Sequence, residues 1–311
     1  MDKRALISGA AGFVSRQLAA YLVKEGLEIH GIDLPSVLPP RDWPGYWYPG
    51  DVTDAKRVFT IVREVEPDYV FHLAALNKNN SLGDLLTINV IGTQNVLDAL
   101  LVVRPKASIL ITGSSAECGL ARPEELPIRE GNPLRPLSPY GISKLAQSLL
   151  AAQYFYRHGL SVLRSRTFNL TGPGEPDTLV CSSFARQIAE IERGLSPLVL
   201  KVGNLNSTRD FVDVRDAVRA YWLIAQFGEP GKIYNVCSGV PTSIQEILNI
   251  LLEVATVKPL IQEIPELQTA WDVPVQVGCF ELLHETLGWK QEIPLVQSLR
   301  DNLNSWRAHL S

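Results

Sequence analysis

Residues 4–15 read Arg4-Ala-Leu-Ile-Ser-Gly9-Ala-Ala-Gly12-Phe-Val-Ser15, a short apolar run followed at once by closely spaced glycines. The apolar run predicts a buried strand and the residues after Gly12 predict a helix, so the glycines stand at a strand-to-helix turn. Glycines there let backbone N–H groups and the helix N-terminus approach the pyrophosphate of a dinucleotide. A tight turn needs glycine for its own geometry, so this stretch alone is a weak indication of a cofactor site.

The first half of the chain repeats this strand-and-helix pattern. Short β-branched runs predict further strands at residues 28–32, 46–48, 69–72, 108–112 and 161–165. Amphipathic runs predict helices at residues 13–25, 55–65, 85–103 and 140–158. The alternation predicts an α/β fold of the Rossmann type, a doubly wound parallel sheet with helices on both faces. Pro-rich stretches at 35–44 and 123–139 predict long loops, which favour binding roles.

The pattern changes after Asn169, where helical segments are separated by loops rich in proline and glycine. These helices are predicted at residues 182–193, 214–226, 244–252 and 295–308. We expect residues 1–168 to form a dinucleotide-binding domain, which also receives residues 204–238 by chain crossing. Residues 169–203 and 239–311 are expected to form a smaller, mainly helical substrate-binding part.

The composition limits the class of protein. Hydrophobic residues make up 46% of the 311 positions, enough for one large domain and a smaller one. The formal net charge of −4, without a run of Lys or Arg, argues against a nucleic-acid partner. We expect no signal peptide and no apolar run that approaches the ~20 residues needed to span a bilayer. Four scattered cysteines lack metal-ligand or redox spacing, so we expect a reduced, cytoplasmic protein with no metal site and no membrane contact.

Three residues form a candidate catalytic set: Ser114, Tyr140 and Lys144. Positions i and i+4 of a helix share a face, so Tyr140 and Lys144 can point into one site. A lysine ammonium beside a phenol is expected to lower the phenol's pKa from about 10, and such a phenol can exchange a proton near neutral pH. Ser114, at the end of a strand, could hydrogen-bond the same substrate oxygen. Tyr-x-x-x-Lys is also a common surface spacing, but the glycine turn upstream favours the catalytic interpretation.

Asp33 ends the second predicted strand, about 20 residues after the glycine turn. A carboxylate at this place can bind the ribose diol of adenosine. Its charge would repel a 2′-phosphate, so we favour NAD(H) as the cofactor and leave NADP(H) open. The alternative is an aspartate that serves only a turn or a helix cap.

Further motifs resemble a known family. Asp51-Val52, Phe71-His-Leu-Ala-Ala75 and Asn89, taken with the glycine turn and Tyr140-x-x-x-Lys144, resemble the extended short-chain dehydrogenase/reductase superfamily over nearly the whole chain. Ser15 replaces the family's third glycine, a small residue with which cofactor binding is still expected. The resemblance implies that the cofactor is bound by Gly9, Ala11, Gly12, Phe13, Val14, Asp33, Asp51, Val52, Leu73, Ala74, Ala75, Asn89, Thr112, Tyr140 and Lys144.

The second half carries another set of motifs. It comprises Arg166-Thr-Phe-Asn169-Leu-Thr-Gly-Pro-Gly174, Lys201-Val-Gly-Asn204, Arg209-Asp-Phe-Val-Asp-Val-Arg-Asp216 and Tyr234-Asn-Val-Cys-Ser-Gly239. This set resembles the nucleotide-sugar branch of the superfamily, most closely the GDP-6-deoxy-D-mannose reductases (GDP-4-dehydro-6-deoxy-D-mannose reductases) and their relatives, the GDP-mannose 4,6-dehydratases. The resemblance implies a nucleotide-sugar substrate bound by Ser115, Asn169, Val180, Lys201 and Arg209.

Arg209 suits a diphosphate, because a guanidinium group matches phosphate oxygens with two parallel hydrogen bonds. The alternative for Arg209 is an ion pair with Asp210 or Asp213. The alternative for Lys201 is a solvated surface position.

The chain departs from the family pattern at several places. Dehydratases of the family carry an acid two positions after the catalytic Ser or Thr, where this chain has Ala116. Glu117 follows, but alternation along a strand would point it to the opposite face. The remaining departures are Cys118 in place of a tyrosine, a short loop at 76–86 rich in Asn (Asn77, Asn79, Asn80), and Gln268-Thr-Ala-Trp-Asp272-Val-Pro274, which lacks an arginine.

The resemblance implies an enzyme that reduces the 4-keto group of a nucleotide-activated deoxysugar with NAD(P)H. One alternative is an NAD-dependent nucleotide-sugar 4-epimerase, which uses the same three catalytic residues. Another is a non-catalytic NAD-binding regulator that keeps only the fold. A homodimer through the helices at 85–103 and 140–158 is also implied. The apolar residues Leu145, Leu149, Leu150 and Phe155 fit such an interface, and they fit packing on the sheet equally well.

Overall fold

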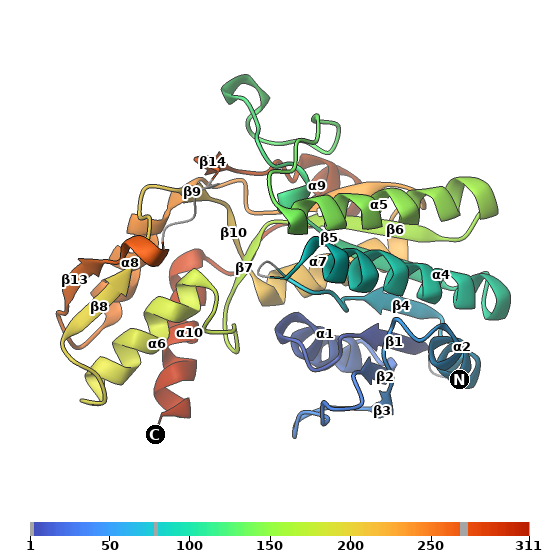
Figure 1. Cartoon of the computed structure of the whole chain (residues 1–311), viewed down its shortest axis with the longest axis horizontal. Helices are drawn as coiled ribbons and strands as arrows, with labels where there is room; N and C mark the ends of the chain where they lie inside the picture. The colour runs from blue at the N-terminus through green and yellow to red at the C-terminus, as the bar shows by residue number, and fades with distance from the viewer. Residues whose placement is uncertain (1–2, 78–79, 268–272, 311) are drawn as a thin grey trace.

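The computed structural model describes residues 3–77, 80–267 and 273–310. Its centre is a seven-stranded parallel sheet in the order β11-β6-β5-β4-β1-β2-β3 (Figure 1). The strands are β1 (Arg4–Ser8), β2 (Glu28–Asp33), β3 (Tyr46–Pro49), β4 (Tyr69–His72), β5 (Ser108–Ser114), β6 (Val162–Thr167) and β11 (Ile233–Val236). The predicted Rossmann-type doubly wound sheet is confirmed.

The order of the strands reverses beside β1. The chain runs from β1 outward to β2 and β3, and then returns to β4 on the other side of β1. Ser8, the last residue of β1, lies opposite Ile32 of β2 and His72 of β4. In sheets of this kind ligands bind at the carboxyl edge where the order reverses. The glycine turn that follows Ser8 therefore lies at the expected binding edge.

Helices cover both faces of the sheet, because successive strand residues point to opposite sides. Ile7 belongs to the core cluster formed with α1 (Phe13–Lys24) and α7 (Val214–Phe227). Its neighbour Leu6 belongs to the cluster formed with α2 (Ala55–Val65), α4 (Gly92–Val103) and α5 (Pro139–His158). The sheet is thus buried on both sides, which accounts for the apolar runs in its strands.

The helix predicted at 85–103 is longer and less regular than expected. It consists of α3 (Leu82–Leu86), a π-helical turn (Thr87–Ile91) and α4. Together Leu82–Val103 give 22 helical residues, and an 18-residue window within them has a mean hydropathy of 1.5. By length and composition this stretch is long and apolar enough to cross a membrane. The expectation that no apolar run approaches this length is therefore wrong. Leu97 and Leu100 of this stretch are buried in the core beneath the sheet, and the absence of membrane contact stays a prediction.

After β6 the chain crosses between the sheet and a second body. β7 (Asn169–Thr171) pairs in parallel with β10 (Phe211–Asp213), and α7 and β11 then return to the large sheet. In the second body α6 (Val180–Glu192), α8 (Ile244–Val254) and α10 (Leu295–His309) share a core cluster. Two small sheets complete it, β8 (Val199–Val202) with β13 (Leu260–Glu263), and β9 (Thr208–Arg209) between β12 (Thr242–Ser243) and β14 (Val275–Gln276). The sequence did not predict these short strands.

One C-terminal segment packs against the large sheet. Leu283 of α9 (Glu281–Leu287) and Trp289 lie in the core cluster of α1 and α7. Trp289 Nε1 donates to the Asp216 carbonyl at 3.0 Å. Residues 281–289 were expected in the smaller part, and Leu283 and Trp289 instead lie in the core of the large sheet. The rest of the expected division stays a prediction.

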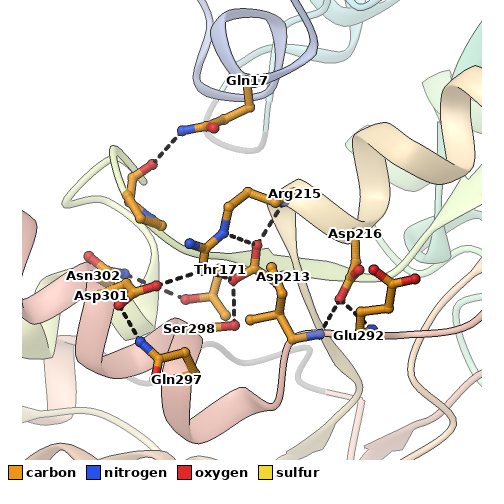
Figure 2. A network of polar contacts seen from close by, with 12 residues as sticks. Gln17, Thr171, Asp213, Arg215, Asp216, Glu292, Gln297, Ser298, Asp301 and Asn302 are labelled. Atoms are coloured by element: carbon orange, nitrogen blue, oxygen red, sulfur yellow. Dashed lines mark hydrogen bonds and ion pairs between the residues drawn. The ribbon is translucent and has the colours of Figure 1, made fainter. Parts of the chain in front are cut away.

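A polar network joins the start of α7 to α10 (Figure 2). The Asp213 carboxylate is buried and accepts hydrogen bonds from the backbone N, Nε and Nη2 of Arg215 at 2.8, 2.9 and 2.8 Å. Ser298 Oγ of α10 donates to Oδ2 of the same carboxylate at 2.5 Å, the oxygen that also accepts from Arg215 Nη2. Arg215 also pairs with Asp301 at 2.7 Å, nearer the surface. The network fixes α10 against the segment that returns to the sheet.

Asp213→Ala should lower the free energy of unfolding by about 3 kcal/mol, because it strands the donors of Arg215 and Ser298 in a buried site. Asp301→Ala is the matched control, because it removes the more exposed partner of the same arginine and should cost less than about 1 kcal/mol. Urea denaturation of the wild type and the two variants measures the free energy of unfolding of each. Equal effects would contradict the central place given to Asp213.

Candidate active site

The glycine turn is shaped by close approach of two strands. Gly9 adopts a φ of +68°, and a Cβ on it would lie 2.9 Å from the backbone N and Cα of Ala74. Only glycine lets the turn lie this close to the segment after β4, where Leu73, Ala74 and Ala75 were predicted to contact a cofactor. Gly12 precedes α1 and supplies no side chain to cap it, so the N–H groups of the first turn at Phe13 and Val14 are left for a ligand.

Asp33 lies beside this turn. Its Oδ2 accepts from Ala11 N at 2.8 Å and its Oδ1 accepts from Leu34 N at 2.8 Å. The carboxylate therefore ties the end of β2 to the glycine turn and keeps its negative charge at the cofactor edge. Both predicted interpretations of Asp33, as a turn residue and as a ribose ligand, are compatible with this position.

Other predicted cofactor residues serve the fold of the same edge. Asp51 Oδ1 accepts from Thr53 N at 2.8 Å, and Val52 is buried in the turn before α2. The Asn89 amide is buried in the π-helical turn and hydrogen-bonds the backbone of Leu76 in both directions, at 2.8 and 3.2 Å. These contacts hold the loop that follows β4, and direct cofactor contacts by these residues stay predictions.

The three candidate catalytic residues meet at the carboxyl ends of β4 and β5. Tyr140 is the second residue of α5, which begins after the capping residue Ser138. The Ser114 side chain, at the end of β5, lies beside the Tyr140 hydroxyl. Gly141, the next residue of α5, lets the start of this helix pack against Ala116. A Cβ on it would lie 2.4 Å from the Ala116 carbonyl oxygen.

Lys144, one turn after Tyr140, is buried. Its Nζ donates to the carbonyl of Thr112 at 2.6 Å and to Gln147 Oε1 at 2.5 Å. The Thr112 hydroxyl donates in turn to the His72 carbonyl at 2.9 Å, so it serves the sheet edge. An ammonium group has three N–H donors, and two of them have these partners.

A buried polar relay that sequence reasoning missed supports Lys144. Gln147 Nε2 donates to Thr93 Oγ1 at 2.7 Å, and Thr93 Oγ1 lies 2.9 Å from His72 Nε2. His72 Nδ1 lies 2.7 Å from Ser8 Oγ at the end of β1. Burial lowers the pKa of His72 to about 3, so this imidazole is neutral. The one signal in the sequence was a histidine at the end of an otherwise apolar strand.

The electrostatics differ from the expectation for Tyr140. Burial raises the pKa of Tyr140, the hydrogen bond from Ser114 opposes this, and the Glu117 charge raises it further. Burial has the opposite effect on a cationic group: it lowers the pKa of Lys144 to about 8, although the Glu117 charge raises it. The predicted lowering of the Tyr140 pKa by Lys144 is therefore wrong for this structure. The physical reason is that the ammonium group is directed to Thr112 and Gln147 while desolvation dominates at the phenol.

Glu117 does not replace the acid that Ala116 lacks. The Glu117 carboxylate accepts from Ser114 N at 2.8 Å, which closes a capping box around the 3-10 turn Ser115–Glu117. It also lies 3.4 Å from Arg166 Nε, and both side chains are buried. The carboxylate is thus held behind the turn by the backbone and by Arg166. The expected strand alternation does not apply, because Ser115–Glu117 is a 3-10 turn.

The predicted substrate residues lie in different segments. Asn169 Nδ2 in β7 donates to the Asp210 carbonyl at 3.1 Å, and Arg209 Nη1 in β9 donates to the Val273 carbonyl at 2.6 Å. Val180 is the first residue of α6. Lys201 is exposed in the separate sheet of β8 and β13, so the structure does not bring it together with the catalytic set.

The alternatives for Arg209 can be examined through the two aspartates. Asp210 accepts from the backbone N–H groups of Ser238, Gly239 and Gly278 at 2.7, 2.9 and 3.1 Å, and Asp213 pairs with Arg215.

Asn79 and the stretch Gln268–Asp272, both noted as departures from the family, lie outside the described residues.

The comparisons identify the class of protein. The chain matches the NAD dependent epimerase/dehydratase family over residues 5–237, and it belongs to this family of enzymes. Among curated relatives, it is 34% identical to the GDP-6-deoxy-D-mannose reductase of Pseudomonas aeruginosa over 100% of this chain and 99% of that one. It is 28% identical to a Vibrio cholerae GDP-mannose 4,6-dehydratase, over 80% of this chain and 71% of the other.

Solved structures agree with this assignment. RMD from Pseudomonas aeruginosa complexed with NADPH matches with a TM-score of 0.88 and 33% identity over 99% of both chains. The UDP-glucose 4-epimerase of Thermus thermophilus in complex with NAD matches with a TM-score of 0.86 and 26% identity, over 98% of this chain and 99% of the other. The resemblance to the nucleotide-sugar branch, nearest to the GDP-6-deoxy-D-mannose reductases, is confirmed.

The buried Lys144 makes stability depend on pH. Its pKa is about 8 in the folded chain against 10.5 for a free lysine, so the unfolded chain binds more protons between these values. The free energy of unfolding of the wild type should therefore rise with pH across this window. Lys144→Met should lack this rise in the free energy of unfolding. Lys106→Met, at an exposed lysine, is the control that should keep it. Urea denaturation at several pH values measures it, and parallel curves for wild type and Lys144→Met would contradict the pKa shift.

Proposed function

We propose that this chain reduces the 4-keto group of a GDP-linked 6-deoxysugar, converting GDP-4-dehydro-6-deoxy-D-mannose to GDP-D-rhamnose with NADH or NADPH. The observation that carries the proposal is the meeting of Ser114, Tyr140 and Lys144 at the carboxyl edge of the sheet, with Lys144 bound to the Thr112 carbonyl one turn after Tyr140. The full-length similarity to a GDP-6-deoxy-D-mannose reductase supports the substrate class.

The residues fit a dinucleotide and a reduction. When bound, NAD(P)H would supply the hydride for the keto carbon. The uncapped start of α1 and the close approach at Gly9 leave a backbone cradle for the pyrophosphate. Tyr140 gives its proton to the developing alkoxide, and its raised pKa keeps the phenol protonated for this role as an acid. Ser114 donates a hydrogen bond to the same oxygen, which stabilises the charge that develops there.

Lys144 completes the catalytic set through its third N–H group. With two N–H groups on Thr112 and Gln147, the third is available for the nicotinamide ribose. A dehydration step has less support at this site. Ala116 carries no acid, and the Glu117 carboxylate is held by Ser114 N and Arg166.

The cofactor preference depends on Asp33. Its charge lies against the glycine turn, where it repels a 2′-phosphate, and this favours NADH. The Pseudomonas aeruginosa neighbour with NADPH supports NADPH as a second cofactor. We propose that both dinucleotides serve, with NADH bound more tightly, and titration with each measures the preference.

The decisive experiment supplies the proposed substrate. Purified protein with NADH or NADPH and GDP-4-dehydro-6-deoxy-D-mannose should consume one reduced dinucleotide per sugar and yield a 4-hydroxy product, identified by NMR. Tyr140→Phe should lower kcat about a hundredfold, because it removes the proton donor, while dinucleotide binding is retained. A 4-epimerase would consume no added NADH. Normal turnover by Tyr140→Phe would contradict the acid assigned here.

We also propose that the enzyme is a homodimer through the outer faces of α4 and α5. Leu149 and Tyr156 of α5 are 60% and 77% exposed and lie seven positions apart on one face, and Val102 of α4 is 70% exposed. Leu150 and Phe155 pack instead against the inner core. The mass in solution should be twice that of the 34.4 kDa chain. Leu149→Arg should shift it to the monomer, and a monomeric wild type would contradict the interface.

A further inference from the structure

Ser115 and Gln276 form a reciprocal pair of hydrogen bonds beside the catalytic residues. Ser115 Oγ donates to Gln276 Oε1 at 3.0 Å, and Gln276 Nε2 donates to the Ser115 carbonyl at 2.8 Å. Both side chains are buried, so losing one partner leaves the other's polar atoms unsatisfied. The pair joins segments 161 positions apart in the sequence.

Gln276 belongs to the strand that lies beside Arg209. β14 pairs in parallel with β9, and Gln276 is the residue opposite Arg209. Before Gln276, the Val273 carbonyl accepts from Arg209 Nη1 at 2.6 Å. After it, Gly278 N donates to Asp210 Oδ2 at 3.1 Å. The segment that carries Gln276 is therefore held to Arg209 and Asp210 on both sides.

Ser115 is the residue directly after Ser114. It begins the 3-10 turn, in which Ser114 Oγ accepts from Ala116 N at 3.2 Å. The Ser115 carbonyl also accepts from Cys118 N at 3.0 Å, so the bond from Gln276 and the bond to Ser114 Oγ belong to one hydrogen-bonded turn. A shift of this turn moves the Ser114 hydroxyl that lies beside Tyr140.

We propose that Gln276 is a positioning residue, which couples the strand that carries Arg209 to the Ser114–Ser115 turn. The proposal deepens the reduction proposed above and rests on it. With the diphosphate of the sugar nucleotide on Arg209, the Ser115–Gln276 pair sets where the keto carbon lies relative to Ser114 and Tyr140. Small displacements of reacting groups cost large factors in rate, so such a link is a means of setting kcat. Glutamine suits the place because one amide both donates and accepts, whereas leucine of similar size does neither.

The test compares substitutions at the pair. Gln276→Leu should lower kcat about tenfold, while the Kd for NADH and NADPH changes less than about twofold. Ser115→Ala removes the Oγ donor but keeps the carbonyl acceptor, so its kcat should fall between Gln276→Leu and wild type. Val275→Ala, in the same strand, leaves the pair intact and is the control. An active wild type whose kcat Gln276→Leu leaves unchanged would overturn the proposal.

A second measurement does not depend on the substrate. Amide hydrogen exchange across residues 114–118 should be faster in Gln276→Leu than in wild type and Val275→Ala, because the turn loses its link to β14. Unchanged exchange in this turn would overturn the coupling. If the wild type reduces no keto sugar but Gln276→Leu still exchanges faster than the wild type, the proposed function is overturned and the coupling is supported. If Gln276→Leu does not fold, kcat and amide hydrogen exchange are both measured on Ser115→Ala.

Discussion

A buried ammonium group organises the carboxyl edge of the large sheet. Burying a cation is costly unless its donors have partners, and Lys144 meets this demand through the Thr112 carbonyl and Gln147. Gln147 is held in turn by the relay through Thr93 and His72 to the end of β1. The helix α5 can therefore take one position on the sheet, and that position decides where Tyr140 lies.

The close approach of α5 to the turn after β5 follows from the same constraint. With Lys144 fixed on the Thr112 carbonyl, the first turn of the helix lies against Ala116, where only Gly141 fits. The phenol then meets Ser114 in a site dry enough to raise its pKa. A proton donor results in place of the phenolate that proximity to a lysine alone would suggest.

The sequence predicted most of the large sheet and the proximity of Ser114, Tyr140 and Lys144, because long periodic segments and a fixed helical spacing are local properties. Short strands such as β9 and β14 depend on pairing between distant segments, so two-residue stretches gave no pattern to detect. The contacts of Gln276 and Thr93 were hidden for the same reason. The pKa of Tyr140 was mispredicted because residue spacing shows which charge is near and gives no measure of desolvation.

The place of Trp289 bears on how the chain is made. This indole fills the core under the large sheet, although it comes well after β11, the last strand of that sheet in the sequence. During synthesis the strands of the large sheet leave the ribosome before this side chain does, so their core lacks one of its largest buried side chains until Trp289 follows. The interior on this face of the large sheet is therefore completed by a segment that is made after all of the sheet's strands.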